Sequence, residues 1–301
     1  MFGGGWLRST REAFRDERLP AAVRWTMASE GTAYWLGYVA RRLGKRLGDE
    51  REARALLSRG VAPAWERRYA SMRARGLPIP ALDEDPGALP IAMLALHPGP
   101  VFRTQSWLYD GVGGAARGVR ARLRGERWLR GWDAEARWRE VTVHLGEMLV
   151  SLTQVLPDAG LDRTNSLLGE ACHAFGVQVA RGVKWTLDLP DGPDSAIEVL
   201  RMGEYVFRVN PEHSEGSDAG ARTGFLEGNA CPWYDRPGWG GMHCGIFGRF
   251  QDGCASVFGL DYRLTQTIPR HGGDICRVEL RPISERQLLK KKRKRAARVS
   301  A

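Results

Sequence analysis

The 301-residue sequence lacks any hydrophobic run long enough to cross a lipid bilayer. A membrane-spanning helix needs about 20 consecutive apolar residues, whereas the longest candidate here, Ile91 to Leu96, has the length of a buried strand. The first residues, Met1 to Trp6, also lack the basic region and the apolar core of a secretory signal peptide. We therefore expect a cytoplasmic protein with no membrane span.

Extremes of composition are also missing, which excludes further classes of protein. Hydrophobic residues make up 43% and charged residues 27% of the chain, values close to those of ordinary globular proteins. Disordered and fibrous architectures are therefore excluded. A chain of this length buries a sizeable core without the help of disulfides.

Cysteine is scarce and does not follow a metal-binding spacing. The five cysteines cannot all pair, and a cytoplasmic compartment favours free thiols, a metal site or a nucleophile over structural disulfides. No Cys-x-x-Cys pair occurs, and the spacings of the last four match no zinc ribbon or zinc finger. We therefore predict no structural zinc and no cofactor, and leave a catalytic metal or a haem-type ligand open.

The net charge of +10 is unevenly distributed. Seven cationic side chains lie between Lys290 and Arg298, which leaves only +3 for the remainder of the chain. A basic block at a terminus is typical of a solvated tail that contacts nucleic acid or acidic surfaces weakly. We therefore predict a disordered basic tail at 283–301 and a folded body whose charges nearly balance.

The first 80 residues are predicted to be helical. Apolar residues recur at helical spacing within Ala22 to Leu47, and a second helical stretch covers Asp49 to Arg75, where Pro63 is a candidate break. Four prolines then fall between Leu77 and Pro90, a composition typical of a linker. We place a domain boundary there.

Residues 91–282 are predicted to form an α+β domain. Its first half is expected to hold a strand, a glycine-rich turn and two helices, at Ile91 to His97, Gly111 to Gly118, Trp132 to Leu156 and Leu161 to Thr186. On the last of these helices we expect Cys172 in the core and His173 at the surface, because neighbouring helical residues project about 100° apart. The second half predicts strands around one helix, in the order Tyr205 to Val209, a polar loop Asn210 to Gly220, Thr223 to Leu226, the helix Gly240 to Phe258, Asp261 to Ile268, a turn Pro269 to Gly273, and Asp274 to Leu280. This order predicts an antiparallel sheet packed on helices.

Residues with chemical function gather in the C-terminal third, Arg222 to Pro282. This stretch holds four of the five cysteines and two histidines, His243 and His271. On the predicted helix, His243 shares a face with Cys254, and Cys244 points elsewhere. The alternative is that this face is ordinary core, with Cys254 packed inside and His271 a turn residue.

Three cysteines of this stretch are candidates for one shared site. Cys231 lies on a predicted loop, where a thiol is either partly exposed and reactive or buried under Trp233. Cys276 lies on a strand neither face of which is cleanly apolar, so the direction of its side chain stays open. If the sheet packs on the helix, Cys231, Cys244 and Cys276 converge around one pocket.

The same stretch resembles two known families. It is similar to the L-2-amino-thiazoline-4-carboxylic acid hydrolase family in the motifs Asn229-Ala230-Cys231-Pro232, His243-Cys244, Gly259-Leu260, Thr265-Gln266-Thr267 and Gly272-Gly273-Asp274-Ile275-Cys276. It also resembles the 4-vinyl-reductase-like domain, in which a late Gly-Asp and a Cys recur, matched here by Gly273, Asp274 and Cys276. Both resemblances imply an α+β domain that holds a small molecule.

The first resemblance implies a hydrolase-like enzyme that opens a C–N or C–S bond of a small heterocyclic or amino-acid-derived substrate. In this hypothesis Cys231 or Cys244 attacks an amidine-like carbon as a thiolate, and His243 transfers the proton. Asp235 or Asp274 orients the imidazole.

Four residues are predicted to bind the substrate. Thr265 and Thr267 are expected on one strand face, where they bind a substrate carboxylate or, in the alternative, face solvent as ordinary strand residues. Asp274 and Cys276 complete this set. The second resemblance implies a different function, the non-catalytic binding of a tetrapyrrole or another small ligand. A homodimer formed through the helical region is also left open.

Overall fold

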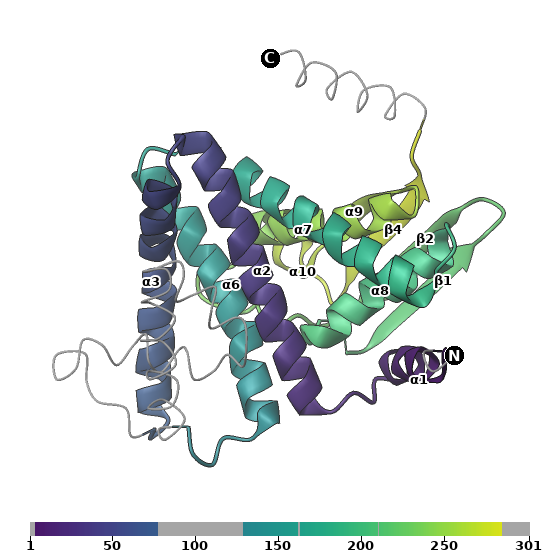
Figure 1. Ribbon diagram of the computed structural model, residues 1–301, viewed down its shortest axis with the longest axis horizontal. Coiled ribbons are helices and arrows are strands. Elements are labelled where there is room, and N and C mark those ends of the chain that lie inside the picture. The colour runs from purple at the N-terminus through teal and green to yellow at the C-terminus, as the bar shows by residue number, and fades with distance from the viewer. Residues whose placement is uncertain (1–3, 78–128, 162, 210, 285–301) are drawn as a thin grey trace.

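The computed structural model describes residues 4–77, 129–161, 163–209 and 211–284 (Figure 1). Its elements, in chain order, are α1 Gly4–Arg15, α2 Ala21–Leu47, α3 Glu50–Ala74, α6 Ala134–Asp158, α7 Thr164–Leu187, α8 Pro193–Val206, β1 His213–Asp218, β2 Thr223–Gly228, α9 Gly241–Val257, β3 Leu260–Gln266, α10 Ile268–His271 and β4 Cys276–Pro282. Among these helices none is long and apolar enough to span a membrane. The sequence-predicted linker at 78–90, the strand at 91–97, the turn at 111–118 and the basic tail from 285 onward lie outside the described residues.

The predicted helices of the N-terminal region are present, and one expected break is not. Asp49 caps α3 by accepting hydrogen bonds from the backbone N–H groups of Arg51 and Glu52. The helix then continues through Pro63, so the prediction of a break there is wrong. The region packs closely on α6, where the Ser151 hydroxyl donates to the carbonyl of Gly60 at 2.6 Å. This contact with α6 helps to hold the backbone around Pro63 helical.

The sheet confirms the predicted α+β class. Four antiparallel strands lie in the order β1-β2-β4-β3, and α8 and α9 pack on the sheet. Leu226, Val278 and Leu280 from its inner face form a core with α8 and α9. The outer face carries charged pairs such as Arg277 and Glu227, whose nearest atoms are 2.7 Å apart.

Two predictions around residue 205 are wrong. The expected strand Tyr205 to Val209 is the end of α8 and the turn after it. Its β-branched and aromatic residues favour a strand locally, but Pro193 starts a helix whose apolar side packs on β2 and α9. The expected loop Asn210 to Gly220 contains β1, which is almost fully exposed and is ordered by pairing with β2.

A large hydrophobic core joins the helices. It runs from α2 and α3 through α6 and α7 to α9, and Phe250 packs against both this core and the smaller one under the sheet. Figure 1 shows α7 and α9 in the middle of the molecule, between the long helices on one side and the sheet on the other. Helix α9 therefore belongs to both halves of the structure.

Two glycines set the spacing between α7 and α9. A Cβ atom on Gly176 of α7 would lie 2.0 Å from the carbonyl oxygen of Phe250, and one on Gly253 of α9 would lie 2.3 Å from that of His173. The Cys254 thiol donates to the Gly176 carbonyl at 3.4 Å. The two backbones therefore approach as closely as they do only because both positions lack a side chain.

The substitution Gly176→Ala is expected to lower the free energy of unfolding by about 3 kcal/mol, because the added methyl group meets a backbone oxygen that cannot move aside. Gly182→Ala on the same helix is the matched control, since a Cβ there meets nothing within 4 Å. We expect it to raise stability by about 0.4–1 kcal/mol. Urea unfolding followed by circular dichroism measures both changes, and equal effects would contradict the role given to Gly176.

Candidate functional site

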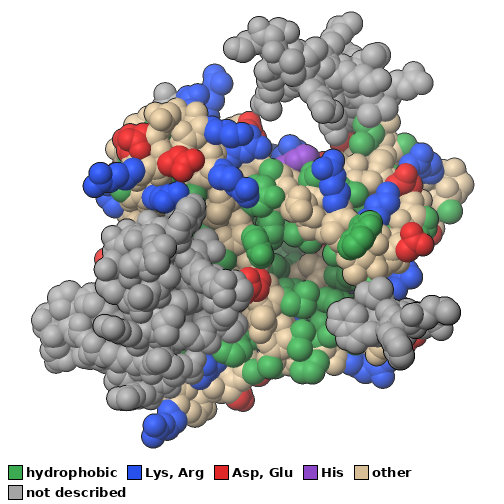
Figure 2. Space-filling view, viewed as in Figure 1, with side chains coloured by type: hydrophobic (Ala, Val, Ile, Leu, Met, Phe, Trp, Pro, Cys, Tyr) green, Lys and Arg blue, Asp and Glu red, His purple; other side chains and the backbone are tan. Residues whose placement is uncertain are grey.

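A pocket of about 160 Å³ lies between the helices and the inner face of the sheet. Figure 2 shows it as a hollow lined by hydrophobic side chains near the middle of the face drawn. Aromatic rings from several elements form much of its wall, among them Trp35 of α2, Phe175 of α7 and Phe247 of α9. Concave, largely apolar sites of this kind are typical of small-molecule binding.

One wall of the pocket comes from the helix that sequence reasoning missed. Leu200, Gly203, Glu204 and Phe207 line the cavity at spacings of i, i+3, i+4 and i+7, which places them on one side of α8. A strand would have spread these residues over two faces. The helical spacing of these residues was visible in the sequence, but the strand-forming residues at 205–209 led to the prediction of a strand.

A second wall is the loop between β2 and α9, which Trp233 fixes in place. The Trp233 indole N–H donates to the Thr142 carbonyl of α6 at 2.7 Å, and the ring lies against Gly146, where a Cβ would come within 2.2 Å of it. Trp239 stacks on Trp233 with ring centroids 5.4 Å apart. The anchored loop carries Cys231 to the edge of the cavity.

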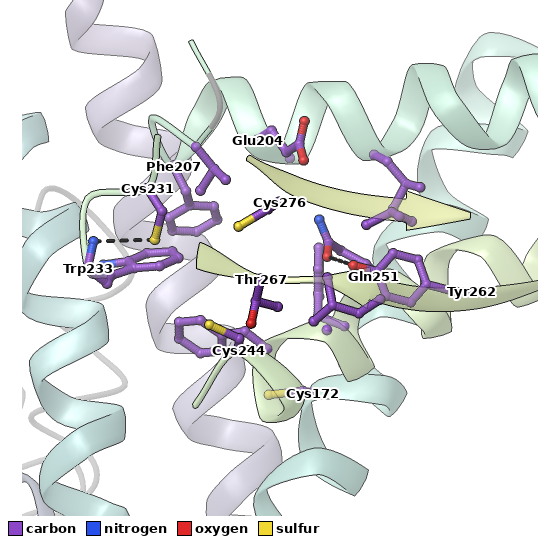
Figure 3. Close-up of a pocket in the computed structure, with 18 of the residues that line it drawn as sticks. Cys172, Glu204, Phe207, Cys231, Trp233, Cys244, Gln251, Tyr262, Thr267 and Cys276 are labelled. Carbon is purple, nitrogen blue, oxygen red and sulfur yellow. Dashed lines mark hydrogen bonds between the residues drawn. The ribbon is translucent and has the colours of Figure 1, made fainter. Parts of the chain in front are cut away.

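The structure brings together the three cysteines that the sequence singled out. Cys231 from the loop, Cys244 from the first turn of α9 and Cys276 from the start of β4 all line the pocket (Figure 3). Cys172 of α7 lines it too, although its thiol is buried, as predicted, and accepts a hydrogen bond from Trp35 Nε1 at 3.2 Å. All five cysteines are free thiols.

Burial holds these thiols in the protonated form. It raises the pKa of Cys231 to about 12, an effect that the backbone N–H of Trp233, 3.4 Å from the sulfur, only partly offsets. Burial likewise raises the pKa of Cys244 and of Cys276. Because the thiolate is the nucleophilic form, the pocket without a ligand contains three weak nucleophiles.

His243 does not lie with the thiols. Its Nδ1 accepts a hydrogen bond from the backbone N–H of Gly240 at 3.0 Å, and its Nε2 lies 3.0 Å from the hydroxyl of Thr153. That hydroxyl gives its own proton to the Val150 carbonyl, so Nε2 carries the hydrogen of a neutral imidazole. His243 therefore caps the first turn of α9 and ties it to α6.

The two threonines predicted to share a strand face lie on opposite sides of the sheet. Between Leu264 and Gln266 the register of β3 shifts by one residue against β4. Such a bulge reverses the alternation of side chains. Thr265 is therefore exposed and donates to the Arg277 carbonyl at 3.2 Å, whereas Thr267 is buried and lines the pocket. The prediction of a shared face is wrong.

The remaining predicted site residues lie away from the cavity. The Asp235 side chain is 68% exposed and lies 4.0 Å from Arg236, and Asp274 is exposed on the loop before β4. His271, predicted to be a turn residue, accepts a hydrogen bond from the Thr267 backbone N–H at 3.0 Å. Neither aspartate therefore contacts the His243 imidazole that it was expected to orient.

The polar groups of the pocket are few. Of the described residues that line it, Glu204 alone is charged, and its carboxylate pairs with Arg201, which does not line it. Tyr262 donates to the amide oxygen of Gln251 (Figure 3). Within the described ranges no cationic side chain lines the pocket, and no three His, Cys, Asp or Glu residues lie together as metal ligands would.

The role of His243 predicts a pH-dependent stability. Burial lowers its pKa below the ordinary value of 6.5, so the folded protein favours the neutral imidazole. Below about pH 6.5 the unfolded chain binds a proton that the folded chain does not, so the free energy of unfolding falls until the pH reaches the lower folded pKa. We expect this fall to be smaller in His243→Gln. A His243 pKa at or above 6.5 in an NMR titration would contradict the assignment.

Comparison of the chain with models of protein families, with curated proteins and with solved structures gave no match. The two family resemblances of the C-terminal third therefore stay predictions. The site itself combines an apolar aromatic cavity, protonated thiols and few polar groups.

Proposed function

We propose that this pocket binds a neutral, mostly apolar small molecule. The observation that carries the proposal is the lining itself, in which aromatic and aliphatic side chains dominate and no cationic side chain takes part among the described residues. A substrate carboxylate would meet Glu204 and no positive partner there. The resemblance to 4-vinyl-reductase-like domains implies the same class of function.

The size of the cavity supports a ligand with one or two rings. Its volume of about 160 Å³ is close to that of an apolar cavity of about 150 Å³ that binds benzene. The opening visible in Figure 2 leaves room for a larger molecule to extend outward. A tetrapyrrole, by contrast, exceeds the enclosed space and requires the walls to move.

We also infer a cytoplasmic compartment, from the five cysteines. Five free thiols persist in a reducing environment and would oxidise or pair in an oxidising one. This supports a cytoplasmic protein.

A side chain that fills the pocket is expected to weaken the binding of an apolar ligand. Gly248 faces the cavity from α9, and a Cβ there makes ordinary contacts at 3.6 Å to Tyr262 and 3.7 Å to Leu264. Gly248→Leu should therefore fold and place its side chain where the ligand lies, raising the dissociation constant of a neutral aromatic probe such as 2-isopropenylnaphthalene at least about tenfold. Isothermal titration calorimetry measures this.

Gly245→Leu is the matched control for that experiment. Gly245 lies on the same helix, is exposed, and has open space where its Cβ would be. We expect the probe to bind this variant as it binds the wild type. Unchanged binding in Gly248→Leu, or equal loss in both variants, would argue against this pocket as the site.

One observation favours a second candidate function, the hydrolase-like opening of a C–N or C–S bond. Cys231, Cys244 and Cys276 come from three separate elements and face one cavity. For such a reaction, a bound substrate has to supply the base or lower a thiol pKa, because His243 is engaged with Gly240 and Thr153. In that case the same pocket would bind the substrate and also catalyse the opening of its C–N or C–S bond, as the hydrolase resemblance implies.

Alkylation of the thiols separates the two functions. Because burial raises the pKa of all three, iodoacetamide should modify them in the native protein at pH 7.5 more than tenfold more slowly than in the denatured chain, at a rate still rising at pH 9. Peptide mass spectrometry follows each cysteine. A fast cysteine whose rate levels off below pH 8 would instead favour the hydrolase, and replacing it by Ser should then abolish turnover.

A further inference from the structure

The Thr267 hydroxyl is buried in the pocket wall without a hydrogen-bond partner. The residue is 4% exposed, and Oγ1 has no hydrogen-bond partner in the protein. A buried hydroxyl left in this condition destabilises the folded protein. A ligand that supplies the missing hydrogen bond would remove this cost.

Local structure explains why this hydroxyl is left unpaired. Thr267 precedes the short helix α10, where a threonine would ordinarily accept hydrogen bonds from the next backbone N–H groups. Pro269 has no N–H, and the Ile268 N–H donates to Cys276 Sγ at 3.4 Å instead. The Thr267 N–H donates to Nδ1 of His271, which fixes the backbone here, and Thr267 lines the cavity with its hydroxyl unpaired.

The indole Nε1 of Trp239 belongs to the same wall. It is buried beside the thiol of Cys244, with no hydrogen bond of normal geometry. Figure 3 shows the Cys244 sulfur and the Thr267 hydroxyl facing the same part of the cavity. An indole N–H is a donor only, and a thiol and a hydroxyl are each both a donor and an acceptor. This end of the pocket therefore presents hydrogen-bond donors to a ligand.

We propose that the ligand carries a neutral hydrogen-bond acceptor, such as a ketone oxygen or a ring nitrogen, which the Thr267 hydroxyl binds while the aromatic walls hold its apolar body. The inference rests on the proposed binding function and adds the ligand's polar group. The Trp239 N–H and the Cys244 thiol supply further donors. A carboxylate is disfavoured because Glu204 lines the same pocket, and a ligand without an acceptor leaves the donors unpaired.

Two probes of the same shape test the inference. 2-Acetylnaphthalene carries a carbonyl group where 2-isopropenylnaphthalene carries a carbon–carbon double bond. We expect the wild type to bind the ketone more tightly. Thr267→Val keeps the shape of the side chain and removes the hydroxyl, so it should weaken the ketone about three- to tenfold and change the alkene less than about twofold. Thr267→Ser should retain the preference.

Thr265→Val is the matched control, because Thr265 lies on the outer face of β3 and should affect neither probe. In the ligand-free protein, Thr267→Val should leave the melting temperature unchanged or raise it. As a measurement that needs no variant, the carbonyl stretch of ¹³C-labelled ketone should shift to lower frequency when bound to the wild type.

The affinities of the two probes for Thr267→Val and for the wild type separate the inference from the binding function. Equal weakening of both probes in Thr267→Val would show that Thr267 acts through packing, and an unchanged affinity for the ketone would show that it makes no hydrogen bond. Either result overturns the inference and leaves the binding function standing. Failure of both probes to bind the wild type, at concentrations up to their solubility, overturns the binding function and the inference with it.

Discussion

The close approach of α7 and α9 is the contact on which the rest of the structure depends. Gly176 and Gly253 each place a backbone against a carbonyl oxygen of the other helix, at a spacing that leaves no room for a side chain. Phe175 and Phe250, next to these contacts, pack on each other with ring centroids 5.3 Å apart and line the pocket. The same contact thus joins the helical half to the sheet and fixes two of the rings that a ligand meets.

The chemistry of the pocket follows from how its polar groups are used. His243, the imidazole that precedes Cys244 in the sequence, is held as a neutral cap of α9 by Gly240 and Thr153. The thiols stay protonated because they are buried among aromatic rings. This arrangement agrees with the proposed binding function, and in the alternative, hydrolase-like function a bound substrate would have to supply the base or lower a thiol pKa.

The sequence predicted α2, α3, α6 and α7 well, because each is long and has an apolar face. The strands β2, β3 and β4 were also located, and so was the convergence of Cys231, Cys244 and Cys276 once the sheet was assumed to pack on α9. Helix α8 was missed because its last residues favour a strand locally, and packing on β2 overrides that preference. Glu204 and Phe207 were therefore missing from the predicted site.

Residues placed by a bulge or by a cap are harder to predict. Strict alternation put Thr265 and Thr267 on one face, but a one-residue shift against β4 turns only Thr267 inward, and nothing in the local sequence marks that shift. The same shift puts a hydroxyl beside thiols and an indole N–H, in a wall that is otherwise apolar. Because the Thr267 hydroxyl has no partner in this wall, a ligand's shape alone does not satisfy this end of the cavity. In the proposed binding function, recognition depends on one polar atom in the ligand as well as on its apolar surface, and the backbone irregularity in β3 creates that requirement.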